Sequence, residues 1–88
     1  MDKTRLVNLA SDLLIKIAHS DLEIKLEFRN YDGGELGFNL VHFDDRYEDH
    51  CYTLHIYQWQ KDDEVMNLFE QMKDVIAGER LFTNEWDT

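Results

Sequence analysis

The sequence predicts an α+β domain of two layers, in which two helices cover one face of a three-stranded antiparallel meander. Apolar residues recur every three or four positions near both ends of the chain, and they alternate with polar residues in three segments between those ends. A glycine pair and an acidic stretch separate the three alternating segments. The predicted element order is therefore α-β-β-β-α. The chain has 88 residues, which is enough for one compact domain over 1–88, with 79–88 as a C-terminal tail packed on the body.

Residues 3–18 are predicted to form the first helix. The apolar positions fall on one helical stripe because they are spaced by three and four residues. That stripe comprises Leu6, Leu9, Ala10, Leu13, Leu14 and Ile17.

Three strands are expected at residues 22–29, 35–43 and 51–58. In each of them apolar residues occupy even-numbered positions, which should face the helices: Leu22, Ile24, Leu26 and Phe28, then Leu36, Phe38 and Leu40, then Tyr52, Leu54 and Ile56. Even positions must pair with even positions, because a slip of one residue would turn a whole strand over. A register with Phe28 opposite Leu36 and His42 opposite Tyr52 satisfies both hairpins.

A second helix should follow, with Asp62 or Asp63 as its N-terminal cap and Gly78 at its end. Its apolar stripe comprises Val65, Leu68, Phe69, Met72 and Ile76. In the tail, Leu81, Phe82 and Trp86 are expected to pack on the body.

Charge excludes several classes of function. Nineteen Asp and Glu residues against nine Lys and Arg give a formal net charge of −10, which opposes binding to nucleic acids and to anionic membranes. A basic protein is the complementary partner, although the same charge also serves solubility. There is one cysteine, no apolar leader and no apolar run of membrane-spanning length, so we expect a cytoplasmic protein.

The stretch "VHFDDRYEDHC" (41–51) contains the residue types of a metal or catalytic site. The spacing of His42, His50, Cys51 and His55 matches no paired zinc-ligand pattern. Strand parity also separates them, because His42 and His50 lie on the inward face or at its rim, whereas Cys51 and His55 point outward. Cys51 and His55 are themselves about 13 Å apart at 3.3 Å per residue, so only a pair of His42 and His50 stays open. The acidic residues lack the glycine and the alternation of a calcium loop. We therefore expect no metal, no cofactor, no catalytic residue and no enzyme activity.

The predicted order is shared with double-stranded RNA binding domains, and the residues distinguish the two. In that family the second helix opens with lysines that bind phosphate, whereas this chain has "KDDE" from Lys61 to Glu64. The likeness is one of topology, which does not carry function.

Carboxylates at the second hairpin and on the outer side of the second helix form the predicted partner-binding surface, together with aromatic residues of the outer sheet face. The predicted residues are Asp44, Asp45, Glu48, Asp49, Asp63, Glu64, Glu70, Asp74, Tyr57 and Trp59. With Val41 and Phe43, the two aromatic residues make an apolar patch that the tail, a partner or a second copy in a homodimer would cover.

Small size, acidity and this element order resemble those of small inhibitor proteins of phages and mobile elements, including some anti-CRISPR proteins. The resemblance covers residues 3–77 and implies a non-enzymatic inhibitor whose carboxylates stand in for phosphates in the groove of a nucleic-acid-binding protein. Two alternatives remain open. One is an immunity protein against a basic toxin nuclease, and the other is a structural or assembly subunit that oligomerises through the outer sheet face.

Overall fold

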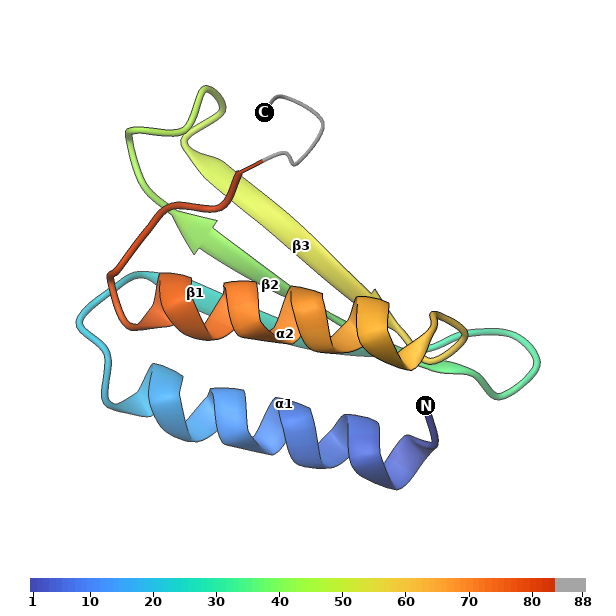
Figure 1. Ribbon diagram of the computed structural model, residues 1–88. Helices are drawn as coiled ribbons and strands as arrows, with labels where there is room; N and C mark the ends of the chain where they lie inside the picture. Colours follow the sequence, from blue (N-terminus) through green and yellow to red (C-terminus); the bar gives the residue numbers. More distant parts are fainter. Residues whose placement is uncertain (84–88) are drawn as a thin grey trace.

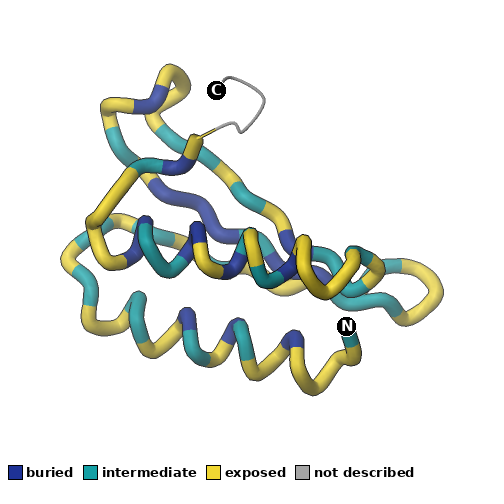
Figure 2. The backbone as a smooth tube through the Cα atoms, in the orientation of Figure 1, coloured by how far each residue is buried: buried dark blue, intermediate teal, exposed yellow. Residues whose placement is uncertain are grey.

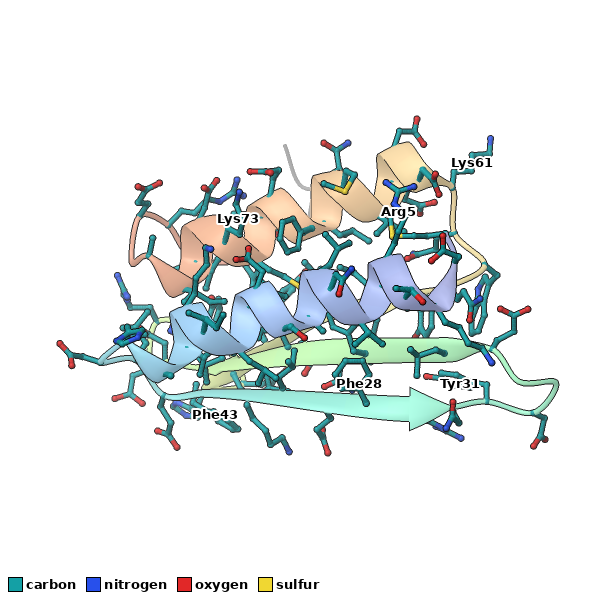
Figure 3. The ribbon with its side chains drawn as sticks, turned by 90° about the horizontal axis from the view of Figure 1, so that it is seen from below. Arg5, Phe28, Tyr31, Phe43, Lys61 and Lys73 are labelled. Carbon is teal, nitrogen blue, oxygen red and sulfur yellow. The ribbon has the colours of Figure 1, made fainter. Side chains whose placement is uncertain are left out.

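A computed structural model describes residues 1–83 and shows two helices packed on one face of a three-stranded antiparallel sheet (Figure 1; Figure 3). The elements are α1 (Lys3–Ala18), β1 (Ile24–Asn30), β2 (Leu36–Phe43), β3 (Cys51–Tyr57) and α2 (Asp62–Ile76). The predicted α+β class and the order α-β-β-β-α are confirmed. The first strand begins two residues later than the alternation predicted, at Ile24.

The strands lie in the order β1-β2-β3, and even-numbered residues pair with even-numbered residues throughout. His42 is opposite Tyr52, as predicted. The predicted pairing of Phe28 with Leu36 is wrong, because Phe28 lies opposite Phe38 and Leu36 lies opposite Asn30.

The first hairpin shifts by two residues because its five-residue loop lies one position later in the sequence than the predicted loop at 30–34. The loop occupies residues 31–35, which the Tyr31 N–H closes by donating to the Glu35 carbonyl at 2.7 Å. Gly33 and Gly34 take φ angles of 89° and 83°, which L-residues with side chains rarely adopt. A shift of two residues keeps the same side chains on the inner face, so the core survives the change in register.

The core lies between the helices and the inner face of the sheet, and Figure 2 shows buried residues as separate dark bands on both helices and as a dark run along β2. Its completely buried members come from four elements, namely Leu6, Ala10 and Leu13 of α1, Leu40 of β2, Ile56 of β3, and Val65, Met72 and Val75 of α2. The placement of Leu14 in the buried stripe is wrong, because its side chain is 49% exposed. Leu14 lies about 100° around the helix from Leu13, which turns it to the flank of α1.

α2 begins without the side-chain cap that the sequence predicted. Its N-cap residue is Lys61, which makes no capping hydrogen bond through its side chain. The Asp62 carboxylate instead lies 3.3 Å from the Met1 amino group and 3.4 Å from the Arg5 guanidinium, so it joins the starts of the two helices. At the other end Gly78 has a φ of 77° and follows the helix, as expected for a helix stop.

The described part of the tail lies against the inner side of the sheet. Phe82 is 4% exposed, and its ring centroid is 5.6 Å from that of Tyr52. Because Tyr52 is an even-numbered residue, Phe82 extends the core, and residues 79–83 of the tail do not cover the outer sheet face. Trp86, which was also expected to pack on the body, lies outside the described residues.

Candidate partner-binding surfaces

Residues 44–50, here called the acidic loop, join β2 to β3 in a compact series of turns. Asp44 N–H donates to the His50 carbonyl at 2.9 Å, and the N–H groups of Tyr47 and His50 donate to the carbonyls of Asp44 and Tyr47 at 3.1 and 3.0 Å. His50 has a φ of 64°, a left-handed conformation at the point where the chain enters β3. The backbone of the loop is therefore held by its own hydrogen bonds.

Tyr47 anchors the acidic loop to the core. Its side chain is 8% exposed, and its hydroxyl lies 2.8 Å from His42 Nδ1 and accepts the Phe82 N–H at 2.9 Å. Because the Tyr47 hydroxyl already accepts the Phe82 N–H, we assign its own proton to the hydrogen bond with His42 Nδ1. Nδ1 is then the acceptor, so the proton of the neutral imidazole lies on Nε2. That Nε2 atom is buried and without a hydrogen-bond partner among the described residues. Burial lowers the pKa of His42 and raises the pKa of Tyr47.

The Asp44 carboxylate is hydrogen-bonded to Arg46 within the acidic loop. Its carboxylate accepts the Arg46 side chain at 2.9 Å from Nε and 2.7 Å from Nη2, and it also accepts the Arg46 backbone N–H at 2.9 Å. These hydrogen bonds hold the pKa of Asp44 well below its ordinary value. Asp44 therefore shapes the loop, and Arg46 offsets its charge.

The remaining carboxylates of the loop point into solvent. Asp45, Glu48 and Asp49 are exposed, and Asp45 lies 3.4 Å from His50 Nδ1. No lysine or arginine pairs with these three in residues 1–83. Within the acidic loop, these three carboxylates remain available to a partner.

Beside the acidic loop lies an open hollow of about 490 Å³. It is lined by Glu23, Phe43, Asp44, Asp45 and His50. Phe43 lies on the outer side of the sheet, away from the helices, and is 36% exposed (Figure 3). An apolar ring beside carboxylates suits a lysine or arginine side chain, which has an aliphatic stem and a cationic head.

The carboxylates of α2 are divided between two positions. Asp63 and Glu64 are exposed at the start of the helix, whereas Glu70 is 3.2 Å from Lys73 and Asp74 is partly buried. Because α2 runs antiparallel to β3, its first turn lies at the end of the sheet opposite the acidic loop (Figure 1). The structure thus does not bring all eight predicted carboxylates onto one surface.

The outer face carries a row of stacked rings, here called the aromatic stack, formed by His55, Tyr57 and Trp59. Tyr57 is stacked on Trp59 with ring centroids 4.6 Å apart, and on His55 at 5.7 Å. Tyr31 from the first hairpin meets Trp59 edge to face at 5.3 Å. Trp59 is 55% exposed, so the predicted residues Tyr57 and Trp59 do lie together at an open surface.

Two residues of this region, Tyr31 and Gly37, were not predicted from the sequence. Gly37 lies opposite Tyr57 in the register, and a Cβ atom there would be 3.0 Å from the Tyr31 ring and 3.1 Å from the Tyr57 ring. The glycine therefore gives both tyrosines room to lie on the strand. A glycine inside an otherwise good strand is the sequence signal for such an approach.

The candidate metal ligands stay apart. His42 is buried against Tyr47, whereas the side chain of His50 is 76% exposed in the loop and lies outside the inner face on which its parity placed it. Among residues 1–83, no group of three His, Cys, Asp or Glu side chains is placed to hold a metal ion.

Comparisons with family models, with curated proteins and with solved structures give no match for this chain. Neither helix in the described part of the chain has the length and apolar character needed to cross a membrane. The geometry of the surfaces is therefore the basis for a functional proposal.

Proposed function

We propose that this protein is a non-enzymatic binding protein that presents its acidic loop to a basic protein. The observation that carries the proposal is the hollow beside the loop, where Phe43 lies next to Asp45 and Glu23. Such a hollow takes the stem of an arginine on the ring and its guanidinium on the carboxylates. The net charge of −10 adds long-range attraction for a basic partner.

Anchoring of the loop supports this role. Binding is weakened when a flexible segment must be ordered, at about 0.5–1.5 kcal/mol for each immobilised side chain. Here Tyr47 is buried and the loop backbone is hydrogen-bonded before any partner arrives. Asp45, Glu48 and Asp49 are therefore presented from a fixed base.

The proposed partner is a nucleic-acid-binding protein, whose phosphate-binding groove the loop would occupy and inhibit. This follows from the resemblance to small acidic inhibitors, in which carboxylates stand in for phosphates. Asp63 and Glu64 would extend the contact only to a partner that reaches the far end of the sheet. A cytoplasmic location is part of the same proposal. An immunity protein against a basic toxin nuclease would use the same surface, and a toxin gene beside this one would favour that alternative.

The exposed aromatic stack favours a second candidate function, a structural subunit that assembles through the outer sheet face. Stacked tyrosine and tryptophan side chains are typical of binding hot spots. A stable oligomer that dissociates with Tyr57→Asp, while the acidic-loop variants leave it intact, would support assembly over inhibition.

Affinity capture from a cell extract tests the first proposal. The tagged protein is incubated at low and at high salt, and bound proteins are identified and then challenged with double-stranded DNA. We expect a basic nucleic-acid-binding protein that is released by high salt and displaced by DNA. The matched variants are Asp45→Lys with Glu48→Lys in the loop and Asp32→Lys with Glu79→Lys elsewhere, which change the net charge equally. Capture that survives the loop substitutions would refute the proposal.

A further inference from the structure

β1 is an open edge of the sheet. The Glu23 carbonyl accepts the Phe43 N–H at 3.0 Å and the Tyr31 N–H donates to the Glu35 carbonyl, so the odd-numbered residues of this strand direct their backbone groups toward β2. In an antiparallel ladder the alternate residues face the other way. Ile24, Leu26 and Phe28 therefore direct their N–H and C=O groups outward, where no strand pairs with them in the described residues.

Apolar side chains are exposed on the same side of the molecule, because α1 and β1 both run along it (Figure 1; Figure 3). Phe28 points to the helix side of the sheet but is 44% exposed. On α1, Val7 and Leu14 are 43% and 49% exposed. Val7 and Leu14 are two turns apart and so share one flank of the helix. Exposed apolar groups beside an open strand edge indicate a surface that a partner covers.

The sequence of β1 is complementary to itself in the antiparallel sense. Around Leu26 as the centre, the flanking residues read Glu-Ile-Lys before it and Glu-Phe-Arg after it. If two copies pair with Leu26 opposite Leu26, Lys25 of each copy lies opposite Glu27 of the other, and Glu23 lies opposite Arg29. On the inner face Ile24 then lies opposite Phe28.

The alternation of backbone hydrogen-bonding groups along β1 is compatible with this register. The outward backbone groups belong to the even-numbered residues, so Leu26 would form the hydrogen-bonded pair at the two-fold axis. The charged odd-numbered residues would then form the non-hydrogen-bonded pairs, whose Cα atoms lie closest, at about 4.5 Å. Within the monomer Lys25 and Glu27 form only an exposed pair at 3.4 Å along the strand, which an intermolecular pair can replace.

We propose that a second copy of this chain occupies the β1 edge, in a two-fold symmetric dimer centred on Leu26 that joins the two sheets into one. The contact is isologous, since each residue pair occurs twice. It buries Phe28 and the exposed flank of α1 against the same elements of the other copy. The β3 edge offers no such match, because Cys51, Thr53, His55 and Tyr57 on its outer face carry no opposite charges.

Net charge opposes this dimer and local charge favours it. Each copy carries −10, but at physiological salt the Debye length is about 8 Å, so distant charges interact weakly. Opposed side chains across a strand pair act at contact, where opposite charges stabilise and like charges destabilise by about 0.2–1 kcal/mol per pair. The arrangement of charges on β1 therefore has more influence on whether two copies pair than the net charge of the chain.

Analytical ultracentrifugation with a charge exchange tests the proposal. The wild-type chain of 10.6 kDa should sediment as a dimer at 0.15 M salt. Lys25→Glu places glutamate opposite Glu27 twice, and Glu27→Lys places lysine opposite Lys25 twice. Each should weaken the dimer about tenfold. The double variant, and an equimolar mixture of the two single variants, should restore it.

The controls are Lys61→Glu and Glu79→Lys, which change the net charge equally at exposed sites away from β1. Circular dichroism confirms that each variant is folded. A monomeric wild type at 100 micromolar would overturn the proposal, and so would a dimer that the single variants leave intact. A double variant that is folded but monomeric would also exclude this register. Dissociation by Tyr57→Asp alone would assign the dimer to the outer face instead.

Discussion

Tyr47 and His42 share a buried hydrogen bond of 2.8 Å, which ties the acidic loop to the central strand of the sheet. The same hydroxyl receives the backbone N–H of Phe82 at 2.9 Å, so the loop, the strand and the tail meet at one oxygen atom. The position of the acidic loop therefore depends on a side chain in its middle that faces the core.

Removing that oxygen should destabilise the protein. Tyr47→Phe leaves the Phe82 N–H without its acceptor and His42 Nδ1 without its donor, and unpaired buried groups cost about 1–3 kcal/mol. Urea unfolding followed by circular dichroism measures the change in the free energy of unfolding. Tyr52→Phe is the matched control, because the Tyr52 hydroxyl makes no hydrogen bond in residues 1–83. Equal losses in the two variants would contradict the role assigned to Tyr47.

Stability should fall as the pH is lowered through about 6.5, the ordinary pKa of histidine. Burial lowers the pKa of His42 in the folded state, so in this range the unfolded chain binds more protons than the folded one. Protonation then favours unfolding, and the contribution of His42 is complete only above pH 6.5.

Urea unfolding between pH 5.5 and 8 measures this dependence. His42→Gln should flatten the profile, and His19→Gln, which removes an exposed imidazole after the end of α1, is the matched comparison. Asp44 does not interfere in this window, because its lowered pKa keeps it ionised there. A profile that His42→Gln leaves as steep as the wild type would show that another group is responsible.

The tail should contribute to the stability of the core through Phe82. Its side chain is 4% exposed, and removal of a buried phenylalanine side chain costs about 3–5 kcal/mol. Phe82→Ala should therefore lower the midpoint of thermal unfolding strongly, while Thr83→Ala at the next, exposed position should change it little. If Phe82→Ala behaved like Thr83→Ala, the tail would not be part of the core in solution.

Gly37 should be required for the aromatic stack. In Gly37→Ala the added carbon would lie 3.0 Å from Tyr31 and 3.1 Å from Tyr57, so both rings must move. Overpacking of this kind costs about 1–3 kcal/mol. The emission of Trp59, read in a Trp86→Phe background, should shift because the Tyr57 ring stacked on it is displaced.

Gly33→Ala serves as the control for this substitution. No atom lies within 4 Å of the added carbon there, although the φ of 89° is unfavourable for alanine. It should lower stability without changing the Trp59 emission. Identical spectra for the Gly37 and Gly33 variants would show that Gly37 does not position the stack.

Much of the fold could be predicted because burial imposes a period on the sequence. The alternation in β1 to β3 decided which residues face the helices, and parity then restricted the pairing to even with even. The exact register depended on where the loop begins, at Tyr31 instead of at Asn30, which alternation does not report. The cap of α2 was missed for a similar reason, because Asp62 is engaged by Met1 and Arg5 from the distant end of the chain.

The candidate site was predictable in composition and less so in geometry. The sequence by itself determined the net charge, the residue types of the acidic loop and the separation of His42 from Cys51 and His55, since these depend on composition and strand parity. Only the tertiary structure decided that Tyr47 anchors the loop, that Arg46 neutralises Asp44, and that the carboxylates of α2 begin at the far end of the sheet. Those relationships depend on contacts between side chains and on the direction of packed elements, which no local pattern encodes.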